Sequence, residues 1–307
     1  MRIEYLSDHV GDMLEDSRAQ TRHKIQQTNR WLAERRRAES ELRASLRSSW
    51  WRRLLRLPSR SERLSRQRIR EANRHLEAVG AARAALDRQN EQLLAGQHGE
   101  EGMLEALRRE LTDEWVCFAG YRNGKGETDL LVVGPNGVWT IEVKYRGVTL
   151  HTDGEQWTFE KFDRYGNLVD SGHAADQTGR SWGRQASDPA EALRSWFERN
   201  NYHPSVRSAV VIIHDRAELG QIQQPGVDFL TTRPSELIGA ITKGKASINH
   251  SDQAAMEALV RRDHRFHTDR RRQRADKANQ PRNGQATSKP ATGHKPRFRS
   301  RRRKPNR

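Results

Sequence analysis

The stretch that most constrains the fold is GETDLLVVGPNGVWTIEVK, residues 126–144. Two runs rich in Val, Leu and Ile flank turn-forming residues at 134–137, a composition typical of a β-hairpin. The same strands carry Asp129, Glu142 and Lys144 among apolar neighbours. A purely structural strand pair gains nothing from side-by-side carboxylates, so this hairpin is also the first place to look for chemistry.

A four-residue loop sets the pairing of the two strands. If residues 134–137 form that loop, counting outward places Asp129 directly opposite Glu142. Opposed residues have Cβ atoms roughly 4.5–5.5 Å apart, and the alternation of side chains puts Lys144 on the face of Glu142. A register shift of one residue would move Glu142 to the other face. The same counting places Glu127 across from Lys144, which predicts a salt bridge between them.

Two neighbouring carboxylates repel each other unless a cation lies between them. Mg²⁺ prefers oxygen ligands and binds through one or two carboxylates together with water and substrate phosphate. We therefore expect Asp129 and Glu142 to hold Mg²⁺ or Mn²⁺. Lys144 beside such an ion is placed to orient or deprotonate a water, or to stabilise charge developing on phosphorus.

A third carboxylate comes from the segment before the sheet. Glu100 lies three, four and seven residues before apolar positions of an expected helix, so it shares their inward face. A catalytic role for Glu100 and a role as an acidic residue in the first helical turn are both open. For Glu101 the second role is expected, because acids near a helix N-terminus interact favourably with the helix dipole.

Charge is distributed unevenly along the 307 residues. Residues 1–98 contain 21 Lys and Arg against 13 Asp and Glu, and residues 264–307 contain 16 against 2, whereas residues 99–263 contain 19 against 25. Two basic ends predict a polyanionic partner. Nucleic acid, with DNA as the first expectation, is the commonest such partner because each neutralised phosphate releases counterions. An anionic membrane surface is the alternative.

Helical patterns dominate residues 1–95. Pro58 ends one helix, and Ser59 with Glu62 makes a capping box for the next, which predicts an antiparallel helical hairpin. Heptad spacing indicates a coiled coil through which the chain can form a homo-oligomer. Its two seams are Ile69, Leu76, Arg83 and Asn90, and Ala72, Val79, Leu86 and Leu93.

The tip of this hairpin, residues 48–60, combines Trp50 and Trp51 with leucines and arginines. A local hydrophobic cluster that closes the turn is one interpretation, and contact with a membrane surface is the other. The longest apolar runs are far shorter than the roughly 20 residues of a membrane span, and the N-terminus lacks a signal-peptide pattern. The one cysteine, Cys117, lies within the apolar-flanked run WVCFAG. These features predict a soluble, cytoplasmic protein with a buried structural thiol.

The remaining patterns predict an α/β core, a mixed sheet flanked by helices. We expect Gly96 and Gly99 to end the helical hairpin before a new helix begins. His214 and Asp215 close a predicted strand and are expected to form a surface pair. Strands are expected at 115–119, 128–133, 138–144, 147–151, 156–162, 207–215 and 227–232, and helices at 190–199, with Asp188 as N-cap and Pro189 in the first turn, and at 234–241.

The chemistry-bearing residues resemble a known family. Gly99-Glu100, Asp129, Gly137 and Glu142-Val143-Lys144 match, in order and spacing, the pattern of the nuclease-related domain (NERD), a branch of the PD-(D/E)xK restriction-endonuclease-like superfamily. The resemblance implies a restriction-endonuclease-like core and metal-dependent phosphodiester hydrolysis, with the Asp and Glu holding Mg²⁺ and the Lys assisting the attacking water.

One part of the family pattern differs. The family tends to carry Asn-Pro followed by a Gln, where this chain has Asp188-Pro189 and then Ala192. Gln185, just upstream, is the open alternative for that later site residue.

The resulting plan has four parts. Residues 1–95 form the helical hairpin, 96–241 the nuclease-like domain, 242–267 a helical extension and 268–307 a disordered basic tail. Because a fold does not determine activity, a non-catalytic nucleic-acid-binding or coiled-coil scaffold protein is the alternative to a nuclease.

Overall fold

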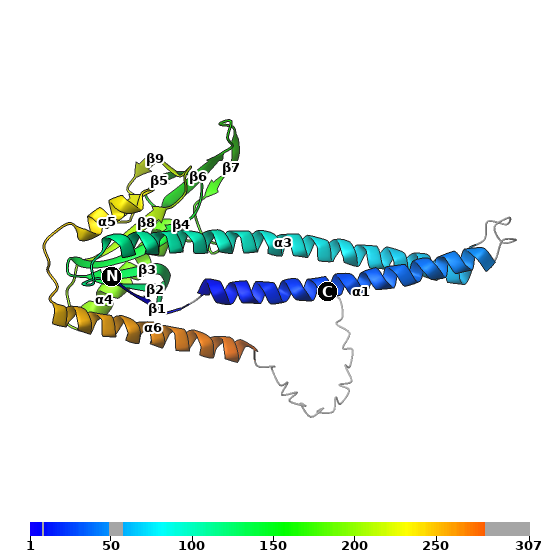
Figure 1. Cartoon of the computed structure of the whole chain (residues 1–307), viewed down its shortest axis with the longest axis horizontal. Helices are drawn as coiled ribbons and strands as arrows, with labels where there is room; N and C mark the ends of the chain where they lie inside the picture. Colours follow the sequence, from blue (N-terminus) through cyan, green and yellow to red (C-terminus); the bar gives the residue numbers. More distant parts are fainter. Residues whose placement is uncertain (8, 49–57, 280–307) are drawn as a thin grey trace, which may run out of the picture. The chain divides into compact units, whose positions relative to one another are not determined.

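The computed structural model describes the chain except for residues 8, 49–57 and 280–307 (Figure 1). The chain divides into two compact units, Met1–Thr268 and a second that begins at Asp269. The first unit contains a six-stranded sheet flanked by helices, a four-stranded sheet and a long N-terminal helical region. This confirms the predicted mixed α/β fold class.

The N-terminal region consists of α1 (His9–Ser48) and α3 (Arg60–Glu110), which run antiparallel. Trp31 stacks on His75 with ring centroids 4.0 Å apart, and Glu41 forms an ion pair with Arg68 at 3.1 Å. Residue numbers that increase along α1 therefore contact residue numbers that decrease along α3, as expected for an antiparallel pair. Trp50 and Trp51 lie outside the described residues.

The start of α3 shows half of the predicted capping box, because Ser59 is the N-cap but the Glu62 carboxylate accepts from Arg66 rather than from the Ser59 N–H. The Ser59 hydroxyl accepts a hydrogen bond from the Glu62 N–H at 3.1 Å. Of the expected seam residues, Ala72 and Val79 are buried. Arg83, also expected in a seam, is exposed and lies 3.9 Å from its ion-pair partner Asp87. Burying a guanidinium group between the helices would cost more free energy than leaving it in solvent.

The predicted break at Gly96 and Gly99 is wrong, since α3 runs through both glycines to Glu110. A helical glycine costs about 1 kcal/mol relative to alanine, yet Gly99 is buried, and a Cβ there would lie 2.9 Å from Tyr145 Cβ. Close packing of α3 on the end of a strand therefore requires Gly99. Because no helix begins here, the interpretation of Glu100 and Glu101 as first-turn acids is also wrong.

The six-stranded sheet has the order β1-β2-β3-β4-β8-β10. Strands β2, β3 and β4 form an antiparallel meander, whereas β1 pairs parallel with β2, β4 with β8, and β8 with β10. The sequence did not predict β1, which is short and shows no clear alternation. The strands are β1 (Arg2–Tyr5), β2 (Val116–Asn123), β3 (Gly126–Gly134), β4 (Gly137–Lys144), β8 (Val206–Ile212) and β10 (Phe229–Thr231).

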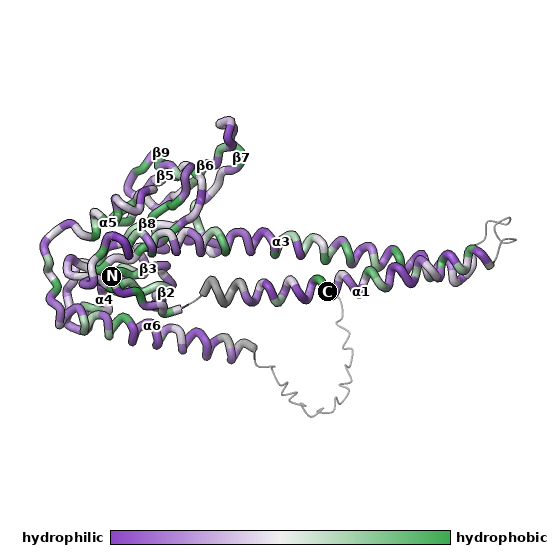
Figure 2. The backbone as a smooth tube through the Cα atoms, in the orientation of Figure 1, coloured by the Kyte–Doolittle hydropathy of each residue, from purple (hydrophilic) through white to green (hydrophobic). Residues whose placement is uncertain are grey.

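Apolar residues on both faces of this sheet pack against helices. One face meets the end of α3 and α5 (Pro234–Thr242) through residues such as Leu107, Ile141 and Leu237. The other face meets α4 (Trp182–Arg199) and α6 (His250–Asn279) through Phe118 and Phe197 among others. Figure 2 shows hydrophilic residues along much of α1, α3 and α6. The core is therefore concentrated around the central sheet.

The second sheet has the order β7-β6-β5-β9, with β5 (Thr149–Asp153), β6 (Gln156–Phe162), β7 (Leu168–His173) and β9 (Glu218–Gln223). Two of these strands were predicted, but β7 and β9 were not, because their residues are mostly exposed and lack an apolar face. A cluster that includes Leu150, Trp157, Trp182 and Ile212 joins this sheet to α4 and β8.

Helix α4 begins at Trp182 rather than at Ala190, and its N-cap is Ser181 rather than Asp188. Pro189 thus lies inside the helix, where it has no N–H to donate to the carbonyl of Gln185. Side chains of the sheet support this stretch. Thr140 donates to the Ala186 carbonyl and Asn123 to the Pro189 carbonyl, both at 2.9 Å.

Helix α6 is also longer than the sequence predicts. Residues 268–279, assigned from the sequence to the disordered tail, continue the helix to Asn279. Arg, Ala, Gln and Lys favour helix even without an apolar face. The rest of that tail, 280–307, lies outside the described residues. Among the described helices, none has the length and apolarity needed to cross a membrane.

Candidate functional site

The hairpin loop is shorter than predicted, because Gly134 also pairs with Gly137. The strands nevertheless have the predicted register, with Val133 paired to Val138 and Leu130 to Ile141. The regular pairing ends there, one position before Asp129 and Glu142. Beyond that point the Asp129 carboxylate accepts a hydrogen bond from the Val143 N–H at 2.7 Å. At the open end of the hairpin, the Asp129 side chain thus takes the place of the backbone acceptor that a paired strand would provide.

Lys144 connects the hairpin to helix α4. Its Nζ donates to Glu142 Oε1 and, at 3.0 Å, to Gln185 Oε1, and it lies 5.9 Å from the centre of the Trp182 ring. Gln185 Nε2 donates to the Arg180 carbonyl at 2.9 Å, which turns the amide oxygen toward the ammonium group. Gln185, which sequence reasoning left open, is therefore a residue of this cluster.

The sequence signal that places Gln185 is the helix start at Ser181. Ser181, the actual N-cap, accepts a hydrogen bond from the Arg184 N–H at 3.3 Å. An N-cap at Ser181 starts the helix early enough to carry Gln185 on its buried side. The Asp188-Pro189 pair instead predicts a later start for this helix, which the structure does not have.

The cluster carries more negative than positive charge. Burial and the neighbouring Glu142 carboxylate raise the pKa of Glu100 to about 7. Burial together with Glu142 and Glu100 raises the pKa of Asp129 well above its usual range. Burial by itself would lower the pKa of Lys144, but the Glu142 and Asp129 carboxylates raise it overall. Three carboxylates therefore share one ammonium in a poorly solvated space.

Glu127 corrects one expectation. It forms an ion pair with Arg122 on β2 and not with Lys144, and its Oε1 lies 2.8 Å from the Ser7 hydroxyl. The reason is that β3 stays paired with β2 through Arg122 and Glu127 to the end of the strand, after its pairing with β4 has ended. Lys144 therefore donates its hydrogen bonds to Glu142 and Gln185 instead.

The carboxylates suit a small oxygen-ligand site. Among the described residues, no group of three or more His, Cys, Asp or Glu side chains is arranged to hold a metal ion. Asp129 and Glu142 make a smaller donor set, in which Oδ2 and Oε1 are engaged. No hydrogen bond from the described residues reaches the other oxygen of either carboxylate. Two such oxygens fit Mg²⁺, which keeps several waters and completes its shell with substrate.

Comparison with known families agrees with this arrangement. Residues 95–213 match the family model of the nuclease-related domain. The chain contains a nuclease-related domain. The matched segment includes Glu100, Asp129, Glu142, Lys144 and Gln185, so the family suspected from the hairpin motif is confirmed. Searches of the curated proteins and of the solved structures found no match.

Proposed function

We propose that the nuclease-related domain hydrolyses phosphodiester bonds of nucleic acid, with DNA as the expected substrate, in a reaction that depends on Mg²⁺ or Mn²⁺. The observation that carries the proposal is the meeting of Asp129, Glu142 and Lys144 with Gln185 from α4 and Glu100 from α3. Polar side chains from three elements gather where a structural sheet would place apolar ones. The family match supports the same reaction class.

The carboxylates and the ammonium have separate tasks. Asp129 and Glu142 would hold the ion through their free oxygens. A bound Mg²⁺ supplies Lewis acidity toward a phosphoryl oxygen and lowers the pKa of a coordinated water. Lys144 has three N–H donors, of which two are engaged, so one remains for the attacking water or a phosphate oxygen. Glu100 borders the pair from α3 as a third oxygen acceptor for water.

Gln185 acts as a positioning residue in this proposal. Its amide is held at both ends, by Lys144 and by the Arg180 carbonyl. Trp182, one turn earlier on α4, lies under the same ammonium. Helix α4 therefore restricts the direction in which Lys144 can point.

A plasmid-cleavage assay tests the proposal. Purified full-length protein is incubated with supercoiled plasmid and Mg²⁺ or Mn²⁺, and nicked and linear products are measured over time. Glu142→Gln and Lys144→Met are expected to lower the cleavage rate about 100-fold or more, as removal of a transition-state donor does in other enzymes. Far-ultraviolet circular dichroism checks that each variant is folded.

Two adjacent glutamates provide a matched control. Glu100→Gln and Glu101→Gln remove the same charge at neighbouring positions of α3. Glu101 is exposed and hydrogen-bonds Gln97 at 2.9 Å, so its replacement should leave the rate unchanged. Glu100→Gln should lower the rate about tenfold, as loss of a supporting group at a metal site does.

Two results would contradict this proposal. Cleavage that persists in both Glu142→Gln and Lys144→Met would show that the hydrolytic site lies elsewhere. If the folded wild-type protein fails to cleave plasmid in the presence of either metal, the non-catalytic alternative would be favoured.

A further inference from the structure

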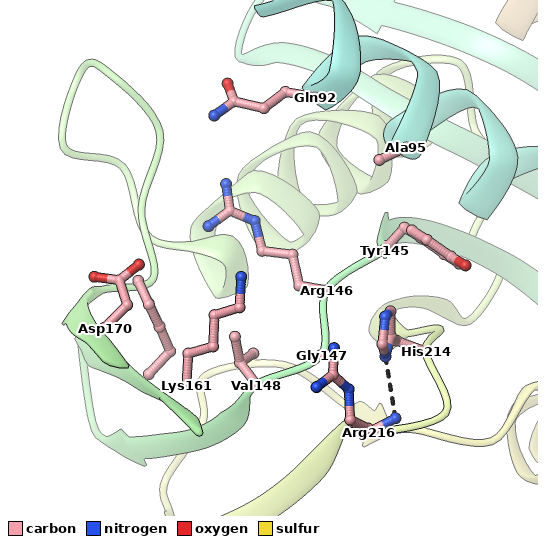
Figure 3. Close-up of a pocket in the computed structure, with 11 residues that line it drawn as sticks. Gln92, Ala95, Tyr145, Arg146, Gly147, Val148, Lys161, Asp170, His214 and Arg216 are labelled. Carbon is pink, nitrogen blue, oxygen red and sulfur yellow. Dashed lines mark hydrogen bonds between the residues drawn. The ribbon is translucent and has the colours of Figure 1, made fainter. Parts of the chain in front are cut away.

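A cavity of about 400 Å³ lies next to this cluster, between α3, the segment that follows β4, and the second sheet (Figure 3). It is not part of the hairpin motif, and the sequence pattern did not single it out. Its lining comes from residues far apart in the chain. These include Gln92 of α3, Arg146 and Gly147 after β4, Lys161 of β6, and His214 and Arg216 after β8.

The cavity has a positive wall. Arg146, Lys161 and Arg216 line it, and the one acidic lining residue is Asp170, which lies opposite Lys161 in the β6–β7 strand register. In the part of the chain that the structure describes, no carboxylate forms an ion pair with any of these three cations. Residues 99–263 have more acidic than basic residues, so unneutralised cations gathered around one cavity are a local exception.

Aromatic rings hold Arg146 in place. Its guanidinium carbon lies 6.0 Å from the centre of the Phe159 ring and 5.8 Å from that of Trp182. Such contacts restrict a guanidinium without neutralising its charge. Trp182 also contacts the Lys144 ammonium. One indole ring therefore positions a cation of the candidate site and a cation of the cavity.

Two segments, helix α3 and the end of β4 with the residues that follow it, contribute residues to both the cavity and the candidate site. On the strand side, Arg146 follows Lys144 by two residues, and the Tyr145 ring between them packs edge-on against His214 with centroids 5.3 Å apart. On the helix side, Gln92 precedes Glu100 by two turns of α3, about 12 Å of helix. His214, expected to be a surface residue, is half-buried in this wall.

We propose that this cavity binds a backbone phosphate of the nucleic-acid strand, adjacent to the phosphodiester that lies at Asp129, Glu142 and Lys144. This inference rests on the proposed function and extends it to how the strand is held. Guanidinium groups bind phosphate through paired N–H donors, and an ammonium adds a point charge. The cavity thereby draws a polyanion toward an otherwise acidic domain.

Strand binding in EDTA tests the pocket separately from catalysis. Full-length protein is titrated into a fluorescein-labelled single-stranded DNA of about 12 nucleotides, and fluorescence anisotropy is read at several salt concentrations. Arg146→Gln combined with Arg216→Gln is expected to weaken binding about tenfold. Loss of one phosphate contact should also reduce the slope of log affinity against log salt by about 0.7.

The control removes two equivalent charges elsewhere. Lys243→Gln combined with Lys245→Gln alters two exposed lysines just after α5. The Asn136 side chain donates to the Thr242 carbonyl at 2.7 Å, so these lysines lie near the β3–β4 turn, at the opposite end of the hairpin. This variant should bind within about twofold of wild type. Lys161→Gln, on the exposed side of β6, is the single-residue test if the arginine variant does not fold.

The outcomes separate this inference from the proposed function. Equal weakening in the arginine and lysine variants would overturn the pocket, because net charge alone would explain it. Thymidine monophosphate binding as tightly as the strand, and only with Arg146 and Arg216 present, would indicate a free-nucleotide site and overturn strand binding. Because the binding assay contains no metal, it tests phosphate binding in the cavity even if the protein does not cleave DNA. In a cleaving protein, a raised KM with unchanged kcat in the arginine variant supports it.

Discussion

The two ends of the β3–β4 hairpin use the same strands and show opposite physical character. At the turn end, Val133 pairs with Val138, and the Val138 N–H donates to the Ser205 carbonyl at 2.9 Å. At the open end, the pairing stops, and Asp129 lies between buried Thr128 and Leu130 while Glu142 lies between buried apolar residues.

The difference lies in how the buried polar groups are balanced. Near the turn, the side chains are apolar and the backbone groups find backbone partners. At the open end, more carboxylates than cations lie close together, which lowers stability in the absence of a ligand. We infer that the turn end contributes to folding and the open end to function, a division common where sites are built at the expense of stability.

The largest stability effect should come from the turn end. Gly134→Ala would place a Cβ 2.0 Å from Trp115 Cε3, and Trp115 is only 4 % exposed. Such overpacking should lower the free energy of unfolding by about 3 kcal/mol. Urea denaturation measures it, with Gly102→Ala on α3 as control. Nothing lies within 4 Å of a Cβ at Gly102, so alanine there should stabilise by about 0.5–1 kcal/mol. An unchanged midpoint for Gly134→Ala would break the comparison.

The next effect has the opposite sign. Asp129→Asn removes one of three clustered carboxylates, and the amide oxygen can still accept from the Val143 N–H. In EDTA at pH 8 the free energy of unfolding should rise by about 1–2 kcal/mol, while cleavage with Mg²⁺ should fall about 100-fold or more. Parallel urea titrations and plasmid assays measure the two quantities. A loss of stability in EDTA would show that the open end is not strained by its charge.

Metal binding should produce a stabilisation of similar size at the same end. Mg²⁺ at about ten times its Kd raises the free energy of unfolding by about 1.4 kcal/mol when it binds only the folded chain. Thermal melts with Mg²⁺ and with EDTA measure the shift in Tm. Glu142→Gln should abolish that shift, and Glu101→Gln should retain it. Equal shifts in all three proteins would point to a metal bound elsewhere.

The smallest effect concerns a charge that is well paired. Hydrogen bonds from Arg261, followed by its positive charge, lower the pKa of Glu4 on β1. A carboxyl with a lowered folded-state pKa adds stability above its unfolded pKa, and this is lost as pH falls through the folded pKa. Both side chains are about a third exposed, so Glu4→Gln should cost only about 0.5 kcal/mol at pH 7.

Denaturation at pH 7 and pH 3 measures this pH dependence. The difference between wild type and Glu4→Gln should shrink on acidification, because Glu4 becomes neutral below its lowered pKa. A difference that grows at low pH would have the wrong sign. Together with Asp129→Asn, this pair of variants separates a balanced charge from an unbalanced one.

Local chemistry was sufficient for much of the site. The turn at 134–137 set the register that brings Asp129 and Glu142 to the same end, and Ser59 as N-cap marked the start of α3. The apolar run around Cys117 predicted its burial, which raises the pKa of the thiol to about 12. Each of these inferences depends on residues within one turn or one strand pair.

The hairpin, its charged residues and the family follow from the sequence alone. Packing between distant segments carries α3 through Gly99, brings Gln185 to Lys144, and places Arg146, Lys161 of β6 and Arg216 of the β8–β9 loop around one cavity. The physical reason is range. Periodicity, capping and turn preferences act over a few residues, whereas a close approach between helix and strand, or a gathering of charges around a cavity, depends on packing between distant segments.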